Sequence, residues 1–209
     1  MLDLSPSMDA ADVAPSRVAR ARFKIRDLLE RRDDAHHGLV AFAGDAFVVS
    51  PVTEDSATLV NLLDALSTRV MPVAGDRFDR AMTTALDLLA RSQNAGAEIL
   101  LVTDGVGASA SGQGARARRA GAVLNVIAVG SADGAPIPAG DGGFVSDEAG
   151  NIVVARVDHG ALAELARTGG GVAVRMTADD ADLDSGRRRR HLSGRGRGRG
   201  ASGHRRASS

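Results

Sequence analysis

The chain has 209 residues, enough for one α/β domain with short extensions, and 44% of them are hydrophobic, so it can bury a substantial core. Only 2% are aromatic, which favours a core of Val, Leu, Ile and Ala, as in a parallel sheet covered by helices. Because there is no Cys, disulfides and thiolate metal sites are excluded. The net charge is +0, but the charges are unevenly distributed along the chain. Nine of the 26 basic residues and none of the 26 acidic residues follow Gly186.

The elements expected in chain order alternate between strands and helices. Residues 1–4 have the pattern of the end of a buried strand that lacks its beginning, so we expect the chain to be truncated at its start. Further strands are expected at 38–42, 46–49, 99–102, 123–129 and 172–176, and helices at 15–32, 55–66, 79–90, 115–120 and 158–168. We expect hairpins at 38–49 and at 142–157, the second turning at 148–151. This alternation predicts a doubly wound α/β sheet.

The pattern stops near Asp184, which divides the chain into a domain at 1–184 and an Arg/Gly-rich tail at 185–209 that we expect to be disordered. The Arg-Gly repeat at 195–200 could contact nucleic acid or an anionic membrane. We favour the interpretation that the tail is a solvated chain end without a binding role. Out-of-frame translation could produce such an end.

No apolar run reaches the roughly 18 residues of a transmembrane helix, and no basic segment precedes the apolar start. We therefore expect neither a membrane span nor a signal peptide, and a soluble chain as written. The composition leaves the compartment unknown.

Two short acidic loops carry the strongest chemical signal. Asp3, Ser5 and Ser7 follow the first strand, and Asp104 follows the strand at 99–102. In open α/β sheets, ligands bind beyond the carboxyl ends of the strands. Carboxylate and hydroxyl oxygens suit a hard cation such as Mg²⁺, Mn²⁺ or Ca²⁺. The alternative is that Asp3 and the serines only cap a helix.

Other chemistries fit the sequence less well. Residues 105–110 match G-x-G-x-x-A, but the acid that a dinucleotide fold requires about 20 residues later is absent, and Asp104 would repel a pyrophosphate. A phosphatase with an Asp nucleophile would need a carboxylate where Ser5 stands. The five His residues show no metal spacing, and no nucleophile and base can be paired. We therefore expect no enzyme activity.

Asp3, Ser5, Ser7 and Asp104 together resemble the metal-ion-dependent adhesion site of von Willebrand factor type A domains. The resemblance runs from Met1 to about Asp184 and is strongest to the bacterial aerotolerance-operon (Bat-type) proteins. The segments that carry it are 2–8, 38–44, 101–105, 129–138, 150–154 and 162–170. It implies a Rossmann-like three-layer domain whose mostly parallel sheet has an antiparallel edge strand and a β-hairpin insertion. It also implies that Ser5 and Ser7 bind the cation directly and that the acids act largely through water.

The chain departs from the family pattern in three ways. Asp76 stands where the second loop usually has Thr or Ser, either as an additional metal ligand or as a cap of the helix at 79–90. Relatives carry membrane helices before and after the domain, whereas we expect none in this chain. The first strand is also shortened to a stub.

The resemblance implies a metal-dependent protein-binding module, whose partner offers an acidic residue to the cation. A membrane-associated complex with a MoxR-type AAA+ ATPase and other proteins of the same family is implied as well. We expect no small-molecule cofactor and no nucleic-acid partner. Two alternatives stay open: a Mg²⁺-dependent phosphoryl hydrolase that uses Asp3, and nucleic-acid binding through the tail.

Overall fold

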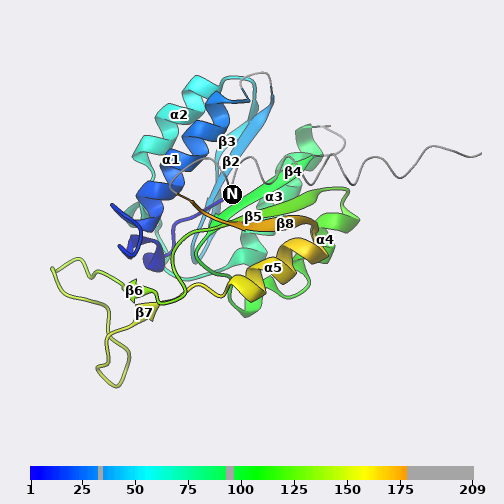
Figure 1. Cartoon of the computed structure of the whole chain (residues 1–209). Coiled ribbons are helices and arrows are strands. Elements are labelled where there is room, and N and C mark those ends of the chain that lie inside the picture. Colours follow the sequence, from blue (N-terminus) through cyan, green and yellow to red (C-terminus); the bar gives the residue numbers. More distant parts are fainter. Residues whose placement is uncertain (33–34, 93–96, 178–209) are drawn as a thin grey trace, which may run out of the picture.

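The computed structural model describes residues 1–32, 35–92 and 97–177, which form a three-layer α/β domain around one central sheet (Figure 1). The sheet has six strands in the order β3-β2-β1-β4-β5-β8. All neighbours are parallel except β2 and β3, which form the antiparallel edge. The strands are β1 (Leu2–Asp3), β2 (His37–Phe42), β3 (Ala46–Thr53), β4 (Glu98–Thr103), β5 (Val123–Ala128) and β8 (Gly170–Arg175). The predicted mostly parallel sheet with an antiparallel edge is confirmed.

Helices cover both faces of this sheet and give the protein two hydrophobic cores (Figure 1). One face is covered by α1 (Arg17–Glu30) and α2 (Ser56–Ala65), whose buried Leu and Ile side chains pack against β1 and β2. The other is covered by α3 (Phe78–Ser92), α4 (Gln113–Arg119) and α5 (His159–Thr168). Short 3₁₀ helices at η1 (Pro6–Asp9), η2 (Thr68–Val70) and η3 (Ala108–Ala110) lie in the connections.

Local capping explains where several helices begin. Ser16 precedes α1 and accepts a hydrogen bond from the Ala19 N–H, while Asp55 and Asp158 do the same at α2 and α5. These side chains satisfy backbone donors that have no partner within the helix. Ser and Asp are among the residues preferred at such positions.

An insertion, here defined as residues 131–157, extends from the end of the sheet between β5 and α5 (Figure 1). Within it β6 (Ala135–Pro136) pairs antiparallel with β7 (Val154–Ala155), and two isolated bridges continue the pairing. The turn falls at 147–151, where Gly150 has a φ of 80°. The predicted hairpin is thus present, although its pairing starts earlier in the chain than expected.

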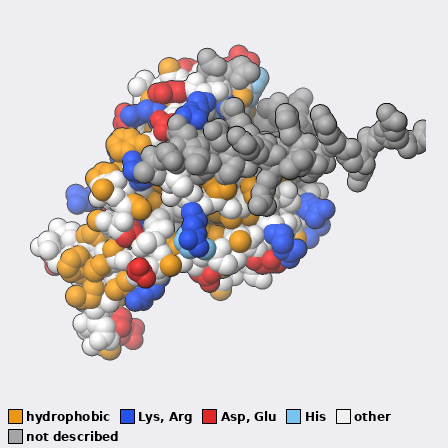
Figure 2. Space-filling model, viewed as in Figure 1, with side chains coloured by type: hydrophobic (Ala, Val, Ile, Leu, Met, Phe, Trp, Pro, Cys, Tyr) orange, Lys and Arg blue, Asp and Glu red, His pale blue; other side chains and the backbone are white. Residues whose placement is uncertain are grey.

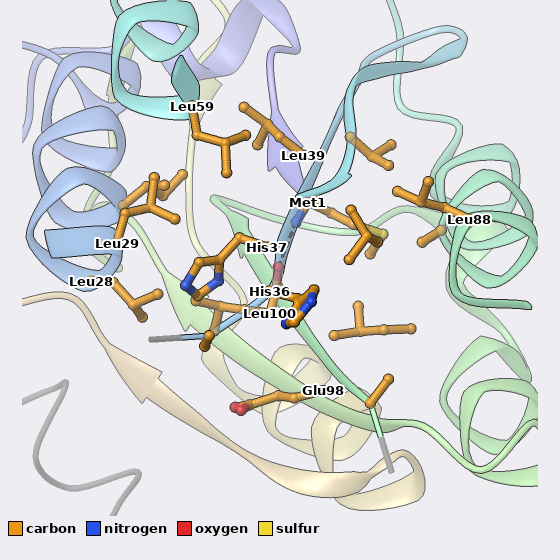
Figure 3. A pocket seen from close by; sticks show the side chains of 18 of the residues that line it. Met1, Leu28, Leu29, His36, His37, Leu39, Leu59, Leu88, Glu98 and Leu100 are labelled. Carbon is orange, nitrogen blue, oxygen red and sulfur yellow. Dashed lines mark hydrogen bonds between the residues drawn. The ribbon is translucent and has the colours of Figure 1, made fainter. Parts of the chain in front are cut away.

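The short β1 leaves a cavity of about 450 Å³ between β2 and β4 (Figure 3). Leu2 pairs with Ala41 on one side and Val102 on the other, so the earlier residues of β2 and β4 have no strand between them. The Met1 amino group donates a hydrogen bond to Leu100 O at 2.6 Å. Burial lowers its pKa to about 5 because the charged form loses hydration.

Two further expectations concern the membrane and the tail. None of the helices in the described residues is long and apolar enough to cross a bilayer. The domain boundary at 184 and the tail at 185–209 lie outside those residues, so the predicted division and disorder stay predictions.

Candidate metal centre

The predicted residues meet at the carboxyl ends of β1 and β4, which are neighbours in the sheet. Asp3 is the last residue of β1, and Asp104 follows directly on β4. Ser5 precedes η1, where Pro6 starts the helix with the fixed φ that suits this position. The parallel register therefore brings together residues that lie about a hundred positions apart in the chain.

Asp3 forms the base of the centre and is 1% exposed. Its Oδ1 accepts a hydrogen bond from the Ser5 N–H at 2.8 Å, and its Oδ2 accepts one from Thr103 Oγ1 at 2.5 Å. Burial and the nearby charge of Asp104 raise the pKa of Asp3 to about 7, although these hydrogen bonds oppose the shift. A bound cation would offset both effects and favour the ionised carboxylate.

The two serine hydroxyls lie side by side at the start of η1. Ser5 Oγ and Ser7 Oγ are 3.0 Å apart, and Ser5 is buried while Ser7 is partly exposed. Each hydroxyl oxygen keeps a free lone pair even when one hydroxyl donates a hydrogen bond to the other. The pair can therefore present two neutral oxygen ligands to one cation.

Asp104 is held by a fully buried guanidinium. Arg17 Nη1 donates to Asp104 Oδ2 at 2.6 Å, and Arg17 is 0% exposed. The same guanidinium forms a bidentate pair with Asp12, with Nε–Oδ1 at 2.8 Å and Nη2–Oδ2 at 2.7 Å. Burial alone would raise the pKa of Asp12, but hydrogen bonds from Arg17 and Ser131 hold it below its usual range.

Asp76 lies beside the loop that follows β4. Its Oδ2 accepts a hydrogen bond from the Gly107 N–H, while its Oδ1 is buried and has no hydrogen-bond partner. Burial is the main reason that the pKa of Asp76 is raised, and the charge of Asp104 adds to the shift, while the backbone N–H groups of Gly107 and of Phe78, at the start of α3, oppose it. A buried carboxylate oxygen without a partner is costly, and a cation or its water would satisfy it.

The donor set fits a hard divalent cation. It offers two hydroxyls and the carboxylates of Asp3, Asp76 and Asp104 near a single guanidinium, so negative charge predominates. Among the described residues, no three His, Asp or Glu side chains are arranged to hold a metal on their own. Any cation here would thus depend on Ser5 and Ser7 as much as on the acids.

Four residues of this network were not predicted as site residues: Asp12, Arg17, Thr103 and Ser131. Thr103 and Ser131 lie in the segments 101–105 and 129–138, which carry the resemblance, whereas Asp12 and Arg17 lie outside them. Arg17 is 87 positions from Asp104, and it opens an amphipathic helix in which Arg is an ordinary exposed residue. Thr103 could have been found, because it directly precedes Asp104 at the end of a buried strand.

Two glycines allow the backbone to approach this network closely. A Cβ at Gly44 would lie 2.5 Å from Ala74 O, in the loop that leads to Asp76, and the Gly44 N–H donates to Val73 O. A Cβ at Gly130 would lie 2.5 Å from Arg17 Nε, and Gly130 has a φ of 112°. Any side chain at either position would displace a neighbour of the centre.

Comparison with known proteins places this geometry in a family. The family model of the von Willebrand factor type A domain matches residues 1–106. An uncharacterised protein of Borreliella burgdorferi is 33% identical over 108 residues, which cover 51% of this chain and 31% of that protein. The chain therefore spans about a third of the length of this curated relative.

Two solved structures are similar over nearly their whole length, both at 30% identity and a TM-score of 0.83. One is an aerotolerance-related membrane protein from Bacteroides fragilis, for which the match covers 90% of this chain and 94% of that one. The other is BatB from Bacteroides thetaiotaomicron, with 92% and 96% covered. A mussel byssus protein, proximal thread matrix protein 1 with a zinc-occupied adhesion-site motif, shares the fold at a TM-score of 0.50 and 18% identity, with 61% and 34% covered.

Proposed function

Because this chain belongs to the von Willebrand factor type A family, we propose that it is a protein-binding module that captures its partner through a divalent cation. The cation would be held by Ser5 and Ser7, with Asp3, Asp76 and Asp104 binding directly or through water. The observation that carries the proposal is the buried, unpartnered Oδ1 of Asp76 beside a cluster with excess negative charge. The zinc in the motif of the mussel protein supports it.

A cation held in this way would act as a Lewis acid toward an oxygen ligand of a partner. An Asp or Glu of the partner would provide the strong, charged ligand that hydroxyls and water do not. The protein's own residues set the strength of that contact. Each carboxylate already near the cation reduces the positive charge that the partner's carboxylate meets.

The insertion supplies a second contact surface at the same end of the sheet. Phe144 is 52% exposed and Ile152 is 53% exposed, and hydrophobic side chains gather over the β6–β7 region (Figure 2). Large apolar side chains contribute strongly when an interface covers them. A partner held by the cation could therefore bury both residues.

The partner we propose is a MoxR-type AAA+ ATPase, together with other proteins of the von Willebrand type in a membrane-associated complex. The similarity to an aerotolerance-related membrane protein of Bacteroides fragilis supports the membrane-associated setting, and the ATPase itself is proposed from the resemblance to Bat-type proteins. The phosphoryl hydrolase alternative is less favoured, because Asp3 is 1% exposed and Ser5 stands where such an enzyme would need a second carboxylate. The proposed nucleic-acid contact of the tail lies outside the described residues.

Calorimetric titration of Mn²⁺ into the parent chain and into Ser5→Ala tests the cation. Ser92→Ala is the matched control, because Ser92 Oγ donates to Leu89 O at the end of α3 and is not among the residues of the centre. We expect weaker binding in Ser5→Ala alone. Capture of the MoxR-type ATPase of the same genome in Mg²⁺ and in EDTA then tests the partner. Absence of Mn²⁺ binding by the parent chain would refute the proposed function.

A further inference from the structure

The buried guanidinium of Arg17 connects the candidate metal centre to the insertion. We propose that Arg17 is a positioning residue that couples cation binding beside Asp104 to the stability of the insertion at its base. This inference rests on the proposed cation binding and adds a conformational response to it. The base is defined here as residues 131–136 and 154–157.

One planar group holds both sides of this connection. Arg17 Nη1 donates to Asp104 Oδ2 at 2.6 Å, and Arg17 Nη2 donates to the backbone oxygen of Ala155 at 2.8 Å. Ala155 belongs to β7, which pairs with β6 inside the insertion. Because the guanidinium is rigid, a movement at one contact alters the geometry of the other.

Asp12 connects Arg17 to the first segment of the base, residues 131–136. It is paired with Arg17 through both oxygens, and its Oδ2 also accepts hydrogen bonds from the Ser131 N–H at 2.7 Å and from Ser131 Oγ at 2.9 Å. Ser131 in turn accepts from the Gly134 N–H through its Oγ and from the Val157 N–H through its carbonyl. Both segments of the base are therefore connected by hydrogen bonds to the buried Arg17 side chain.

Electrostatics gives the direction of the response. A divalent cation near Asp104 attracts the same carboxylate as Arg17 and repels the guanidinium. Because Arg17 and Asp104 are buried, water and salt screen these two electrostatic interactions only weakly. Arg17 then interacts less with Asp104 and more with Asp12 and the Ala155 carbonyl, which tightens the base of the insertion. By linkage, a partner that holds the insertion in this state strengthens cation binding equally.

A purely structural role for this buried ion pair would give a different result. Arg17 would then stabilise the fold to the same extent with and without the cation, and the base of the insertion would not respond to metal. The two roles are separated by a measurement that compares both states of the same chain.

Hydrogen exchange of the backbone amides, measured with and without saturating Mn²⁺, makes this comparison. The reporting amides are those of Ser131, Gly134 and Val157, and those of α2 serve as an internal reference. In the parent chain we expect Mn²⁺ to slow the reporting amides by about fivefold, the lower end of usual allosteric couplings. The slowing should be lost in Arg17→Lys, which keeps the charge but cannot make the three contacts at once.

Arg26→Lys is the matched control, because Arg26 pairs with Asp64 on the exposed side of α1 and α2, and it should behave like the parent chain. If Arg17→Lys does not fold by circular dichroism, Asp12→Asn replaces it with the same expected loss. Mn²⁺ binding without slowing in the parent chain, or equal slowing in the Arg17 or Asp12 variant, would overturn the coupling alone. Absence of Mn²⁺ binding by the parent chain would overturn the coupling together with the proposed function.

Discussion

Extending β1 is expected to stabilise this protein. The cavity between β2 and β4 lies in line with Met1, whose amino group already occupies a position in the parallel ladder with Leu100 (Figure 3). From the register, the three residues before Met1 would lie opposite 37–39 of β2 and 98–100 of β4. We therefore choose the extension Met-Val-Leu-Val, with Met-Gly-Ser-Gly as the matched control.

The size of the effect follows from three contributions. Burying an apolar side chain contributes about 2 kcal/mol, and ordering its residue costs about as much, so these two largely cancel. Hydrogen bonds to the unpaired edges of β2 and β4 remain, at about 1 kcal/mol each. If three or so of them form well, the gain is about 3 kcal/mol, which corresponds to about 6–12 °C in the melting temperature of a domain of this size.

The buried amino group of Met1 also makes the stability of the parent chain depend on pH. Its pKa falls from 8.0 to about 5 on folding, so between these values the unfolded chain binds the extra proton and stability rises with pH. A peptide bond at Met1 has no such charge. The advantage of the apolar extension over the parent chain should therefore be largest at pH 5 and smallest at pH 8. Thermal unfolding of the three chains at both pH values measures this, and equal midpoints for the apolar and polar extensions would refute the reasoning.

Three further predictions concern the centre and the insertion. Asp76→Thr should weaken Mn²⁺ binding about tenfold in calorimetry, because it removes a partly buried negative charge from the proposed site; unchanged affinity would leave Asp76 as a helix cap only. Because Asp3 has a pKa of about 7 and must be ionised to stabilise a cation, Mn²⁺ affinity should rise about tenfold from pH 6 to pH 8, and a flat profile would contradict this. Phe144→Ser with Ile152→Ser should change the free energy of unfolding by less than about 0.5 kcal/mol, since both are exposed. The same pair should weaken capture of the proposed ATPase in a pull-down, and undiminished capture would remove the insertion from the interface.

The fold could be predicted because its signals are local. The apolar runs of β4 and β5 and the Asp caps of α2 and α5 each depend on a few consecutive residues. The mostly parallel sheet with an antiparallel edge followed from the resemblance, whereas the order of the strands comes from the structure. Even the turn of the insertion was correctly placed, because Gly150 provides the positive φ there.

The network behind the centre could not be predicted in the same way. Whether Arg17 faces solvent or the end of the sheet depends on how α1 packs, and the sequence pattern gives only its amphipathic face. The contact of Asp12 with Ser131 depends on the path of the insertion, 119 positions further along the chain. The position of Asp76 was likewise open in the sequence, and its contact with Gly107 now places it beside the β4 loop, while its role as a ligand stays a prediction.

The close approaches at Gly44 and Gly130 have a consequence for mutational tolerance. Neither residue offers a functional group, yet one limits where the loop carrying Asp76 can lie and the other limits the position of the Arg17 guanidinium. In a saturation screen for cation binding, both positions should therefore be as intolerant as the serines, and even alanine should score as a loss of binding. A screen would thus identify backbone positions that shape the centre as well as side chains that could bind the ion.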